Sequence, residues 1–295
     1  MAAKLLVTGA SGKLGRGVIE HLIADQRVAA EDIIAVTRDP AKLGDLAAQG
    51  IEVRQGDLGD AGSLVKAFAG ADRVLVISTD TTPGSGERVK QHSAAVAAAK
   101  AAGASRVLYT SLPKPDVSVI SFAFEHLASE KAVKESGLAY TIFRNGWYAE
   151  NLFMSLPQAL KSGQWFTSAG DGRLAYGARD DFAAAIAGSL ASDEAGNRIH
   201  TLTGPELSTT AEVAALASKV LGKPIEVVQI GDEQLAAGLR QHGLPEPVVA
   251  MIVSIDANTR GGFLDIATPD IETLSGRKPR ALQSFLEANK AALLA

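Results

Sequence analysis

Short apolar runs alternate with longer, alanine-rich stretches over the first half of the chain. The runs are nearly continuous in hydrophobicity, which is typical of parallel strands covered by helices on both faces. The stretches between them have the spacing of amphipathic helices. The predicted strands are 4–8, 33–37, 51–55, 73–78, 106–110 and 139–144, and the predicted helices are 14–24, 41–49, 63–69, 87–102 and 124–136. This order predicts an α/β fold with right-handed crossovers, a Rossmann-type doubly wound parallel sheet.

After about residue 150 the alternation becomes less regular. We therefore expect a nucleotide-binding domain over residues 1–150 and a smaller C-terminal α/β substrate lobe over residues 151–295. Some elements of this lobe are expected to return to the main sheet. The elements predicted there are helices at 152–161, 180–191, 208–221, 232–241 and 247–255, and strands at 199–203 and 225–230.

The composition excludes several classes of function. The 295 residues include no cysteine, which rules out disulfides, thiolate catalysis and cysteine-bound metal clusters. A net charge of −4 without a concentrated basic stretch argues against nucleic acid as the main ligand. No export signal is visible, and no run of about 18 apolar residues occurs. We expect a cytoplasmic protein without a membrane span.

A glycine-rich loop follows the first predicted strand and opens the first predicted helix. It reads Gly9-Ala10-Ser11-Gly12-Lys13-Leu14-Gly15. In this context the first glycine allows a tight turn, the second lets the backbone approach a pyrophosphate, and the third lets the helix pack closely. Backbone N–H groups and the helix dipole favour phosphates at such a helix start. The loop therefore predicts a dinucleotide site.

The residues after the second and third strands bear on which dinucleotide binds. NAD sites hold the ribose 2′-hydroxyl with an acidic residue about 20 positions past the glycines. Arg38 lies there instead, and a guanidinium can pair bidentately with a 2′-phosphate. Lys13 adds a second positive charge, whereas Asp39 is expected to cap the next helix, so the charges favour NADP(H). Asp57 either accepts a hydrogen bond from the adenine amino group or forms a turn.

The Tyr-x-x-x-Lys acid–base pair of many carbonyl reductases with this fold is absent. Phe122 and His126 occupy its expected place, which disfavours dehydrogenases, epimerases and dehydratases that need the pair. His126 is either a catalytic donor of a proton or hydrogen bond, or a partly buried packing residue. Glu130 and Lys131 are expected on the solvated face of the same helix, with Glu130 spaced to pair with Lys134.

Polar and aromatic residues follow the sixth predicted strand. They read Arg144-Asn145-Gly146-Trp147-Tyr148-Ala149-Glu150-Asn151. Ligands of open α/β sheets bind beyond the carboxyl ends of the strands. Amide side chains suit a nicotinamide carboxamide, and flat rings suit a planar substrate. The alternative places Trp147 and Tyr148 in the core, but their position favours function, with Tyr148 as a second candidate catalytic residue beside His126.

These segments together resemble a known family, the NmrA-like, atypical short-chain dehydrogenase/reductases. Within it, the chain is similar to the type 2 NAD(P)H:quinone oxidoreductases, with triphenylmethane reductases as near relatives. The string at 144–148 is the most specific element, and the resemblance covers nearly the whole chain. It rests on residues 8–15, 36–42, 49–55, 109–112, 125–126, 140–141, 144–148, 169–172 and 242–245.

The resemblance implies an NADPH-dependent reductase that passes hydride directly to a quinone or similar planar acceptor, without flavin or metal. Such electrophilic acceptors take hydride without strong prior protonation, which agrees with the missing acid–base pair. The segment 80–88 is least like the family and is expected to form a lip of the site. By position, the implied cofactor contacts are residues 9–14, Arg38, Ser78, Thr79, Asn145, Gly146, Trp147, Tyr148, Glu150, Asn151 and Arg179.

Two classes of function remain open. The first is the reductase, acting on quinones or, alternatively, on triarylmethane dyes. The second is a redox sensor of the NmrA type, which binds NADP(H) without turnover and acts through protein partners. The aromatic strand end and the C-terminal lobe favour the enzyme. A homodimer is also compatible with the sequence.

Overall fold

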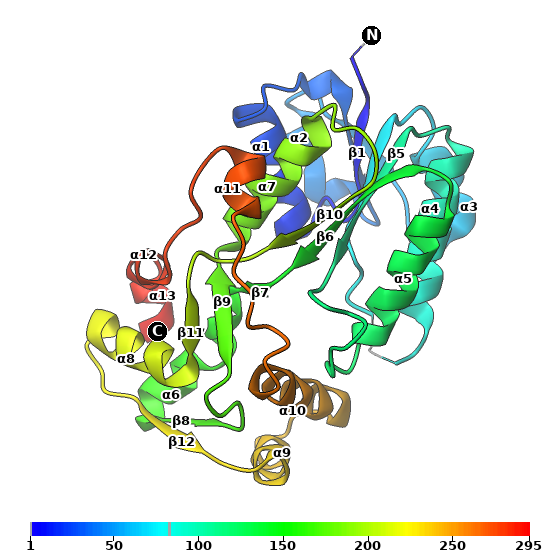
Figure 1. Cartoon of the computed structure of the whole chain (residues 1–295). Coiled ribbons are helices and arrows are strands. Elements are labelled where there is room, and N and C mark those ends of the chain that lie inside the picture. The colour runs from blue at the N-terminus through cyan, green and yellow to red at the C-terminus, as the bar shows by residue number, and fades with distance from the viewer. Residues whose placement is uncertain (1, 82–83) are drawn as a thin grey trace.

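A seven-stranded parallel sheet forms the centre of the protein (Figure 1), whose computed structural model describes residues 2–81 and 84–295. The strand order is β10-β6-β5-β4-β1-β2-β3, and every neighbouring pair is parallel. The chain reverses direction across the sheet after β3, which makes it doubly wound. The strands are β1 (Leu5–Val7), β2 (Ile33–Thr37), β3 (Glu52–Gln55), β4 (Arg73–Val76), β5 (Arg106–Ser111), β6 (Ala139–Asn145) and β10 (Arg198–Leu202).

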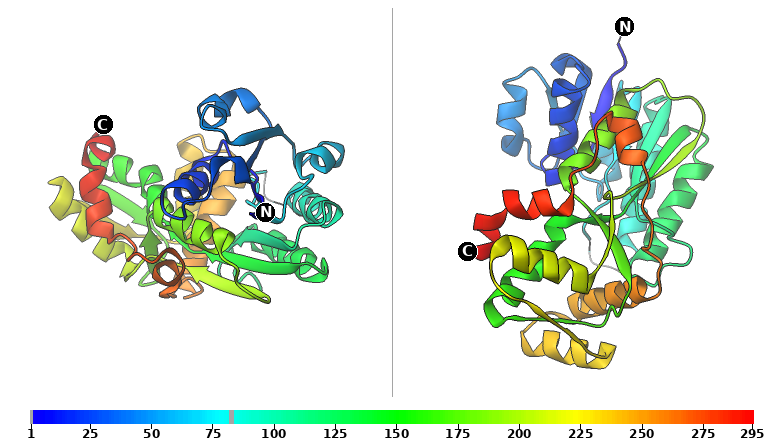
Figure 2. Two further views of the ribbon diagram at one scale, coloured as in Figure 1. Left: turned by 90° about the horizontal axis from the view of Figure 1, so that it is seen from above. Right: turned by 60° about the vertical axis from the view of Figure 1, so that its left-hand side comes forward.

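Helices cover both faces of this sheet (Figures 1 and 2). On one face lie α1 (Lys13–Ala24), α7 (Arg179–Ala191) and α11 (Asp270–Ser275). On the other face lie α3 (Ala61–Ala67), α4 (Glu87–Ala101) and α5 (Ala123–Glu135). Because both faces are covered, all five residues of β2 are buried, as its continuous apolar run predicts. The predicted Rossmann-type fold is confirmed.

The turn after β2 differs from the helix predicted at 41–49. It contains a 3-10 helix, Pro40–Leu43, followed by the short α2 (Gly44–Ala47). A further 3-10 helix, Ala30–Asp32, precedes β2. Asp39 accepts a hydrogen bond from the Ala41 N–H at 3.2 Å, so it caps the 3-10 helix Pro40–Leu43, as predicted.

Elements of the C-terminal half complete the large sheet. β10 pairs with β6 along its whole length. Phe182 and Ile186 of α7 belong to the same buried cluster as Val18 and Leu22 of α1. The return of C-terminal elements to the main sheet, expected from the sequence, is therefore observed.

The rest of the C-terminal half forms a smaller lobe below the large sheet (Figure 1). It contains a three-stranded sheet, β11-β9-β7, and the parallel pair β12-β8, around a core of its own. The patterns predicted β12 and most of the helices but missed the short strands β7, β8, β9 and β11. The elements are β7 (Trp147–Tyr148), a 3-10 helix (Ala149–Met154), α6 (Leu156–Ser162), β8 (Gln164–Thr167), β9 (Arg173–Gly177), β11 (Leu207–Thr209), α8 (Thr210–Leu221), β12 (Glu226–Gln229), α9 (Asp232–Gln241), α10 (Glu246–Arg260), α12 (Leu282–Ala288) and α13 (Lys290–Leu294).

Two kinds of feature are not found within residues 2–81 and 84–295. No helix there is both long and apolar enough to cross a membrane. No group of three or more histidine and acidic side chains is placed to hold a metal ion there either. Of the segment expected to form a lip, 80–88, residues 82–83 lie outside the described part of the chain.

Candidate active site

The glycine loop joins β1 to α1 in the predicted strand–turn–helix arrangement. Gly9 has a φ of +60°, in the left-handed region that favours glycine. The Gly12 N–H donates to the Gly9 carbonyl at 2.9 Å. A Cβ on Gly15 would lie 2.4 Å from the same oxygen, so a larger residue would push α1 away from the loop. Ser11, Gly12 and Lys13 are exposed, which leaves the helix start open to a phosphate group.

The end of β2 is bound to this loop. The Ala10 N–H donates to the Val36 carbonyl at 3.1 Å, and the Thr37 hydroxyl donates to Ser11 Oγ at 3.0 Å. Arg38 follows directly and is exposed. Its guanidinium makes no hydrogen bond or ion pair with the part of the chain that the structure describes. Arg38 therefore lies beside the loop with its charge available to a ligand.

Asp57, after β3, forms a turn. Its Oδ1 accepts a hydrogen bond from the Gly59 N–H at 2.9 Å, and its own N–H donates to Ser63 Oγ at 2.9 Å. The side chain is exposed. The turn alternative is thus realised for one carboxylate oxygen, and a contact between the other oxygen and adenine stays a prediction.

The ends of the central strands are linked through half-buried polar groups. The Ser78 N–H donates to Thr110 Oγ1 at 2.9 Å, which joins the ends of β4 and β5. The Thr79 N–H donates to Nε2 of His92 on α4 at 3.0 Å. Ser78 and Thr79 therefore have fixed backbones at the carboxyl edge of the sheet, where the sequence predicts the cofactor.

Asn145 and Tyr148 meet at the turn between β6 and β7. The Gly146 N–H donates to the Leu202 carbonyl at 2.8 Å and so holds this turn against β10. Asn145 Nδ2 donates to the Tyr148 hydroxyl at 3.0 Å. Asn145 Oδ1 is buried and has no hydrogen-bond partner within the described residues. A buried acceptor without a donor is costly, so this oxygen is suited to a ligand amide.

Tyr148 connects this turn to the first residues of α7. Its ring packs edge-on against Phe182 with the centroids 4.8 Å apart, and the Arg179 guanidinium lies 5.0 Å from its centroid. Glu150 accepts the Arg179 N–H at 3.0 and 3.1 Å. Burial raises the pKa of Tyr148 to about 12, so its phenol stays protonated at neutral pH. The structure thus brings Asn145, Tyr148, Glu150 and Arg179 together.

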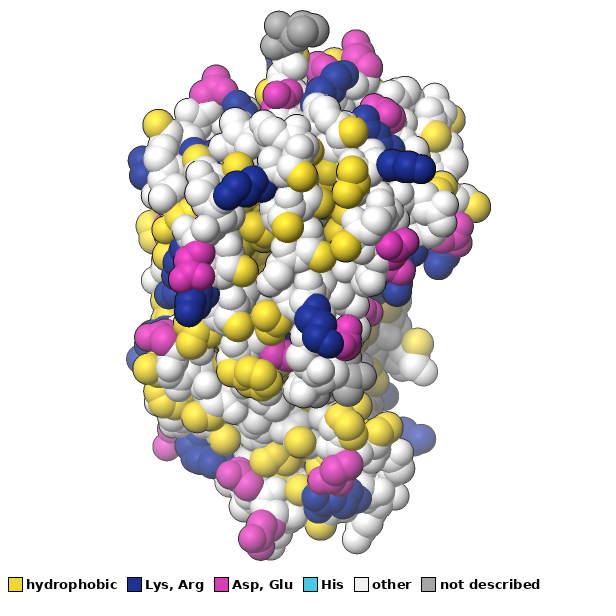
Figure 3. Space-filling model, turned by 90° about the vertical axis from the view of Figure 1, so that its right-hand side faces the viewer, with side chains coloured by type: hydrophobic (Ala, Val, Ile, Leu, Met, Phe, Trp, Pro, Cys, Tyr) yellow, Lys and Arg dark blue, Asp and Glu magenta, His cyan; other side chains and the backbone are white. Residues whose placement is uncertain are grey.

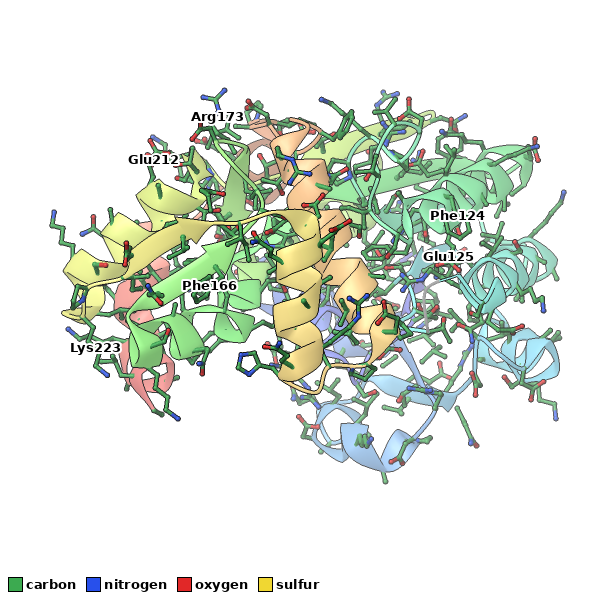
Figure 4. The ribbon with its side chains drawn as sticks, turned by 90° about the horizontal axis from the view of Figure 1, so that it is seen from below. Phe124, Glu125, Phe166, Arg173, Glu212 and Lys223 are labelled. Carbon is green, nitrogen blue, oxygen red and sulfur yellow. The ribbon has the colours of Figure 1, made fainter. Side chains whose placement is uncertain are left out.

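Trp147 lies on the opposite side of β7 and lines a cavity in the C-terminal lobe. The cavity has a volume of about 590 Å³, and Asn151 is also in its wall. Its outer wall includes Phe166 of β8, which is 49% exposed. Figure 4, seen from below, shows Phe166 beside helix α9. Trp147 therefore packs against the core of the lobe and also borders a space large enough for a small aromatic ligand.

A profile of the NmrA-like family matches residues 1–286. The chain belongs to the NmrA-like family. It is 39% identical over 272 residues to quinone oxidoreductase 2 of Escherichia coli, which covers 92% of each chain. The crystal structure of the Escherichia coli NADPH-dependent quinone oxidoreductase complexed with NADPH has a TM-score of 0.90 at 37% identity, covering 96% of this chain and 98% of that one. The triphenylmethane reductase of Citrobacter sp. complexed with NADP(H) has a TM-score of 0.88 at 32% identity, covering 97% and 99%.

In this NmrA-like protein, His126 lies in a buried group of rings and is only 4% exposed. Its Nδ1 is 2.8 Å from the Tyr109 hydroxyl, which is also 3.2 Å from Nδ1 of His92. His92 accepts the Thr79 N–H through Nε2, so its own proton is on Nδ1. Burial lowers the pKa of both histidines to about 3. His126 is therefore neutral near pH 7, which favours the packing alternative over proton donation.

We expect replacement of His126 by asparagine to leave the shape of the pH–rate profile unchanged between about pH 5 and 8. A side chain that stays neutral over this range adds no break to the profile. Turnover is measured for the wild type and the variant across that range, with thermal unfolding as a check on folding. A break near the ordinary histidine pKa that disappears in the variant would contradict this expectation.

Glu130 is fully buried, so the prediction that it lies on the solvated face of α5 is wrong. Its carboxylate accepts two hydrogen bonds from Arg144 of β6, each 2.9 Å long, and one from Ser111 at the end of β5, at 2.8 Å. The predicted pair with Lys134 is confirmed at 3.0 Å, and Lys131 is exposed as expected. The main partner of Glu130 is Arg144 on the neighbouring strand β6, and the spacing of residues along α5 alone does not predict this contact.

The sequence pattern did not predict a second buried carboxylate, that of Glu125. Glu125 is fully buried while its neighbour Phe124 is 56% exposed, and Figure 4 labels both on α5. Arg88 of α4 approaches the Glu125 carboxylate at 3.5 Å. The four-residue spacing of Glu125, Ser129 and Val133, all buried, is the one signal that places this carboxylate on the inner face.

Proposed function

We propose that this protein is an NADPH-dependent reductase that transfers hydride to a quinone or a similar planar acceptor. The observation that carries the proposal is the turn at Asn145–Tyr148, which lies between the glycine-loop side of the sheet and an aromatic cavity. The two relatives described above are named as a quinone oxidoreductase and a triphenylmethane reductase, each with a structure holding this kind of cofactor.

Three groups of residues fit NADP(H). The exposed start of α1 suits the pyrophosphate, and Arg38 with Lys13 suits the 2′-phosphate. The unpaired Oδ1 of Asn145 suits the N–H of the carboxamide. When bound, the reduced nicotinamide supplies a hydride ion, which carries two electrons.

The chain's own residues orient the reactants. Asn145 and Tyr148 hold each other through their hydrogen bond, and Glu150 with Arg179 fixes the end of the same turn. Reduction of a quinone to a hydroquinone consumes one hydride and one proton. We assign the proton to solvent, because His126 is neutral and Tyr148 has a raised pKa. Positioning of two planar groups is then the main contribution of the protein.

We further propose that the reaction uses neither flavin nor metal. A quinone is electrophilic enough to accept hydride directly from the nicotinamide, so no intermediate carrier is needed. Purified active protein is expected to show no flavin absorbance. Its turnover is expected to survive treatment with a metal chelator.

The test of the proposed function is NADPH oxidation with a panel of benzoquinones, naphthoquinones and triarylmethane dyes, followed by the loss of NADPH absorbance. We expect turnover with at least one of these classes. Tight NADPH binding without turnover on any of them would favour the redox-sensor alternative. The aromatic cavity beside Trp147 supports the enzyme, because a sensor needs no space for a second small molecule.

A homodimer and a cytoplasmic location stay predictions. Figure 3 shows the face built by α3, α4 and α5, where apolar side chains lie among charged ones. Val65 of α3 and Phe124 and Leu127 of α5 are 60%, 56% and 40% exposed. Light scattering would give the mass in solution, and cell fractionation would give the location.

A further inference from the structure

The cavity of the C-terminal lobe has a single acidic group in its wall. The cavity lies among α6, β8, α9 and α10, and the described residues that line it include no lysine or arginine. Most of the wall is aromatic or aliphatic, with Trp147, Trp165 and Tyr176 as its largest rings. Asp256 of α10 is the one carboxylate among these lining residues. His242 is the one basic side chain among these lining residues, and a single carboxylate in such a surface is a specific recognition element.

Hydrogen bonds hold Asp256 in a fixed orientation. Its Oδ2 accepts the Thr167 hydroxyl at 2.8 Å and the Ser168 N–H at 2.7 Å. No described residue donates to Oδ1, so this oxygen is left for the cavity. Burial raises the pKa of Asp256, while the two donors on Oδ2 oppose that rise by favouring the charged form.

Arg260 acts on Asp256 through its charge but forms no ion pair with it. Arg260, one helical turn further along α10, donates to both oxygens of Asp232 at 3.0 and 2.8 Å and to the Ser168 carbonyl. Arg260 is not part of the cavity wall. Within the described residues Asp256 has no ion pair. Arg260 balances its partly buried charge only from a distance, so a ligand cation in direct contact would be favourable.

We infer that this cavity binds aromatic ligands that carry a cationic nitrogen, with the charge at Asp256 Oδ1 and the rings against Trp147, Trp165 and Tyr176. Aromatic faces also attract cations directly, so wall and carboxylate favour the same ligand. A volume of about 590 Å³ accommodates two or three fused or linked rings. The inference rests on the proposed reductase function and deepens it, because it names amino- or iminium-bearing aromatics as the preferred acceptors.

The test uses two azobenzene probes that differ in charge and share their rings. 4-(Aminomethyl)azobenzene is cationic at neutral pH, and 4-(hydroxymethyl)azobenzene is neutral. Both tryptophans of the chain line the cavity, so quenching of intrinsic fluorescence by either probe reports binding at this place. The titrations use the whole protein without NADPH, so that binding is measured without turnover.

We expect the wild type to bind the amine about tenfold more tightly than the alcohol. Asp256→Asn should abolish this preference and change the affinity for the alcohol less than about twofold, since asparagine keeps an oxygen for Thr167 and Ser168. Glu233→Gln is the matched control, because Glu233 is an exposed carboxylate on the neighbouring helix α9 and lies outside the cavity wall. It should keep the preference, and thermal unfolding should show that both variants are folded.

Equal affinity of the wild type for the two probes would overturn the inference, even where Asp256→Asn fails to fold. Equal weakening of both probes in Asp256→Asn would overturn it as well. The proposed function fails separately. If the protein oxidises NADPH with neutral quinones but shows no preference for the amine probe, the reductase function is supported and the inference is wrong. If it prefers the amine probe but oxidises NADPH with no acceptor, the inference is supported and the reductase function is wrong.

Discussion

Replacing Arg38 with glutamate is expected to raise the Kd for NADPH about a hundredfold and to change the Kd for NADH less than about threefold. Charge-assisted bidentate hydrogen bonds to a phosphate are among the strongest in proteins. Arg38 is exposed directly after β2, and the preceding Thr37 is hydrogen-bonded to the glycine loop. Glutamate at this position would repel the 2′-phosphate and could accept a hydrogen bond from the 2′-hydroxyl of NADH instead.

The two Kd values are measured by calorimetric titration of the wild type and the variant with each cofactor. Lys66→Glu is the control for the change in overall charge, since Lys66 is an exposed cation on α3 and away from the predicted site residues. It should leave both affinities nearly unchanged. Equal loss of NADPH and NADH binding in Arg38→Glu would refute the assignment of Arg38 to the 2′-phosphate.

Removing the Glu130 carboxylate by substitution with alanine is expected to lower the free energy of unfolding by about 3–5 kcal/mol. The change leaves Arg144, 23% exposed at its side chain, without its bidentate partner, and it also removes the acceptor of Lys134 and Ser111. These contacts join α5 to the ends of β5 and β6. Denaturant unfolding measures the loss, with the m-value as a check that the denatured state is unchanged.

Glu135→Ala is the matched control for this prediction. Glu135 lies on the same helix but pairs with Lys131 at 3.9 Å in an exposed position, and its removal should cost no more than about 0.5 kcal/mol. Similar losses for the two variants would show that the buried network contributes no more than a surface pair.

The same network predicts a dependence on pH. Burial opposes ionisation of Glu130, but the hydrogen bonds from Arg144, Lys134 and Ser111 outweigh it and lower the pKa. A carboxyl with a lowered pKa contributes its full stability above the unfolded-state value of about 4.3 and loses it as the pH falls through the folded-state value. The wild type should therefore lose more stability than Glu130→Ala when both are acidified below this value.

The large sheet could be predicted from sequence because its signals are local. The apolar run of β2 matches the predicted range residue for residue, and the glycine loop marks the start of α1 within one residue. Parallel strands buried on both faces and helices between them give patterns that depend little on distant contacts.

The C-terminal lobe was harder to predict because its strands are short. β7 has two residues and β11 three, so neither is long enough for an alternating pattern to show. The sequence predicted α7 as a helix but did not predict that it packs against α1. The helix is buried on all sides from Asp181 to Leu190, so no polar face indicates which side would face solvent.

Some site residues could likewise be predicted from the local sequence, whereas others depend on contacts with distant parts of the chain. Asn145, Gly146 and Tyr148 were recognisable because they follow the sixth predicted strand, 139–144, and the structure brings Asn145 and Tyr148 together at the turn between β6 and β7. The state of His126 depends on Tyr109 and His92, which come from another strand and another helix. Asp256 belongs to no motif, and only the fold shows that it is the single acid of a cavity wall.

The packing of α7 against α1 also bears on how the chain folds during synthesis. Part of the apolar surface of α1, around Val18, Ile19 and Leu22, is covered only after Phe182 and Ile186 have left the ribosome. The last strand of the sheet, β10, is complete only at Leu202. A nascent chain of about 150 residues therefore exposes an apolar surface on α1 that can aggregate. We expect chaperones that bind apolar surfaces to hold it until about 50 further residues have emerged.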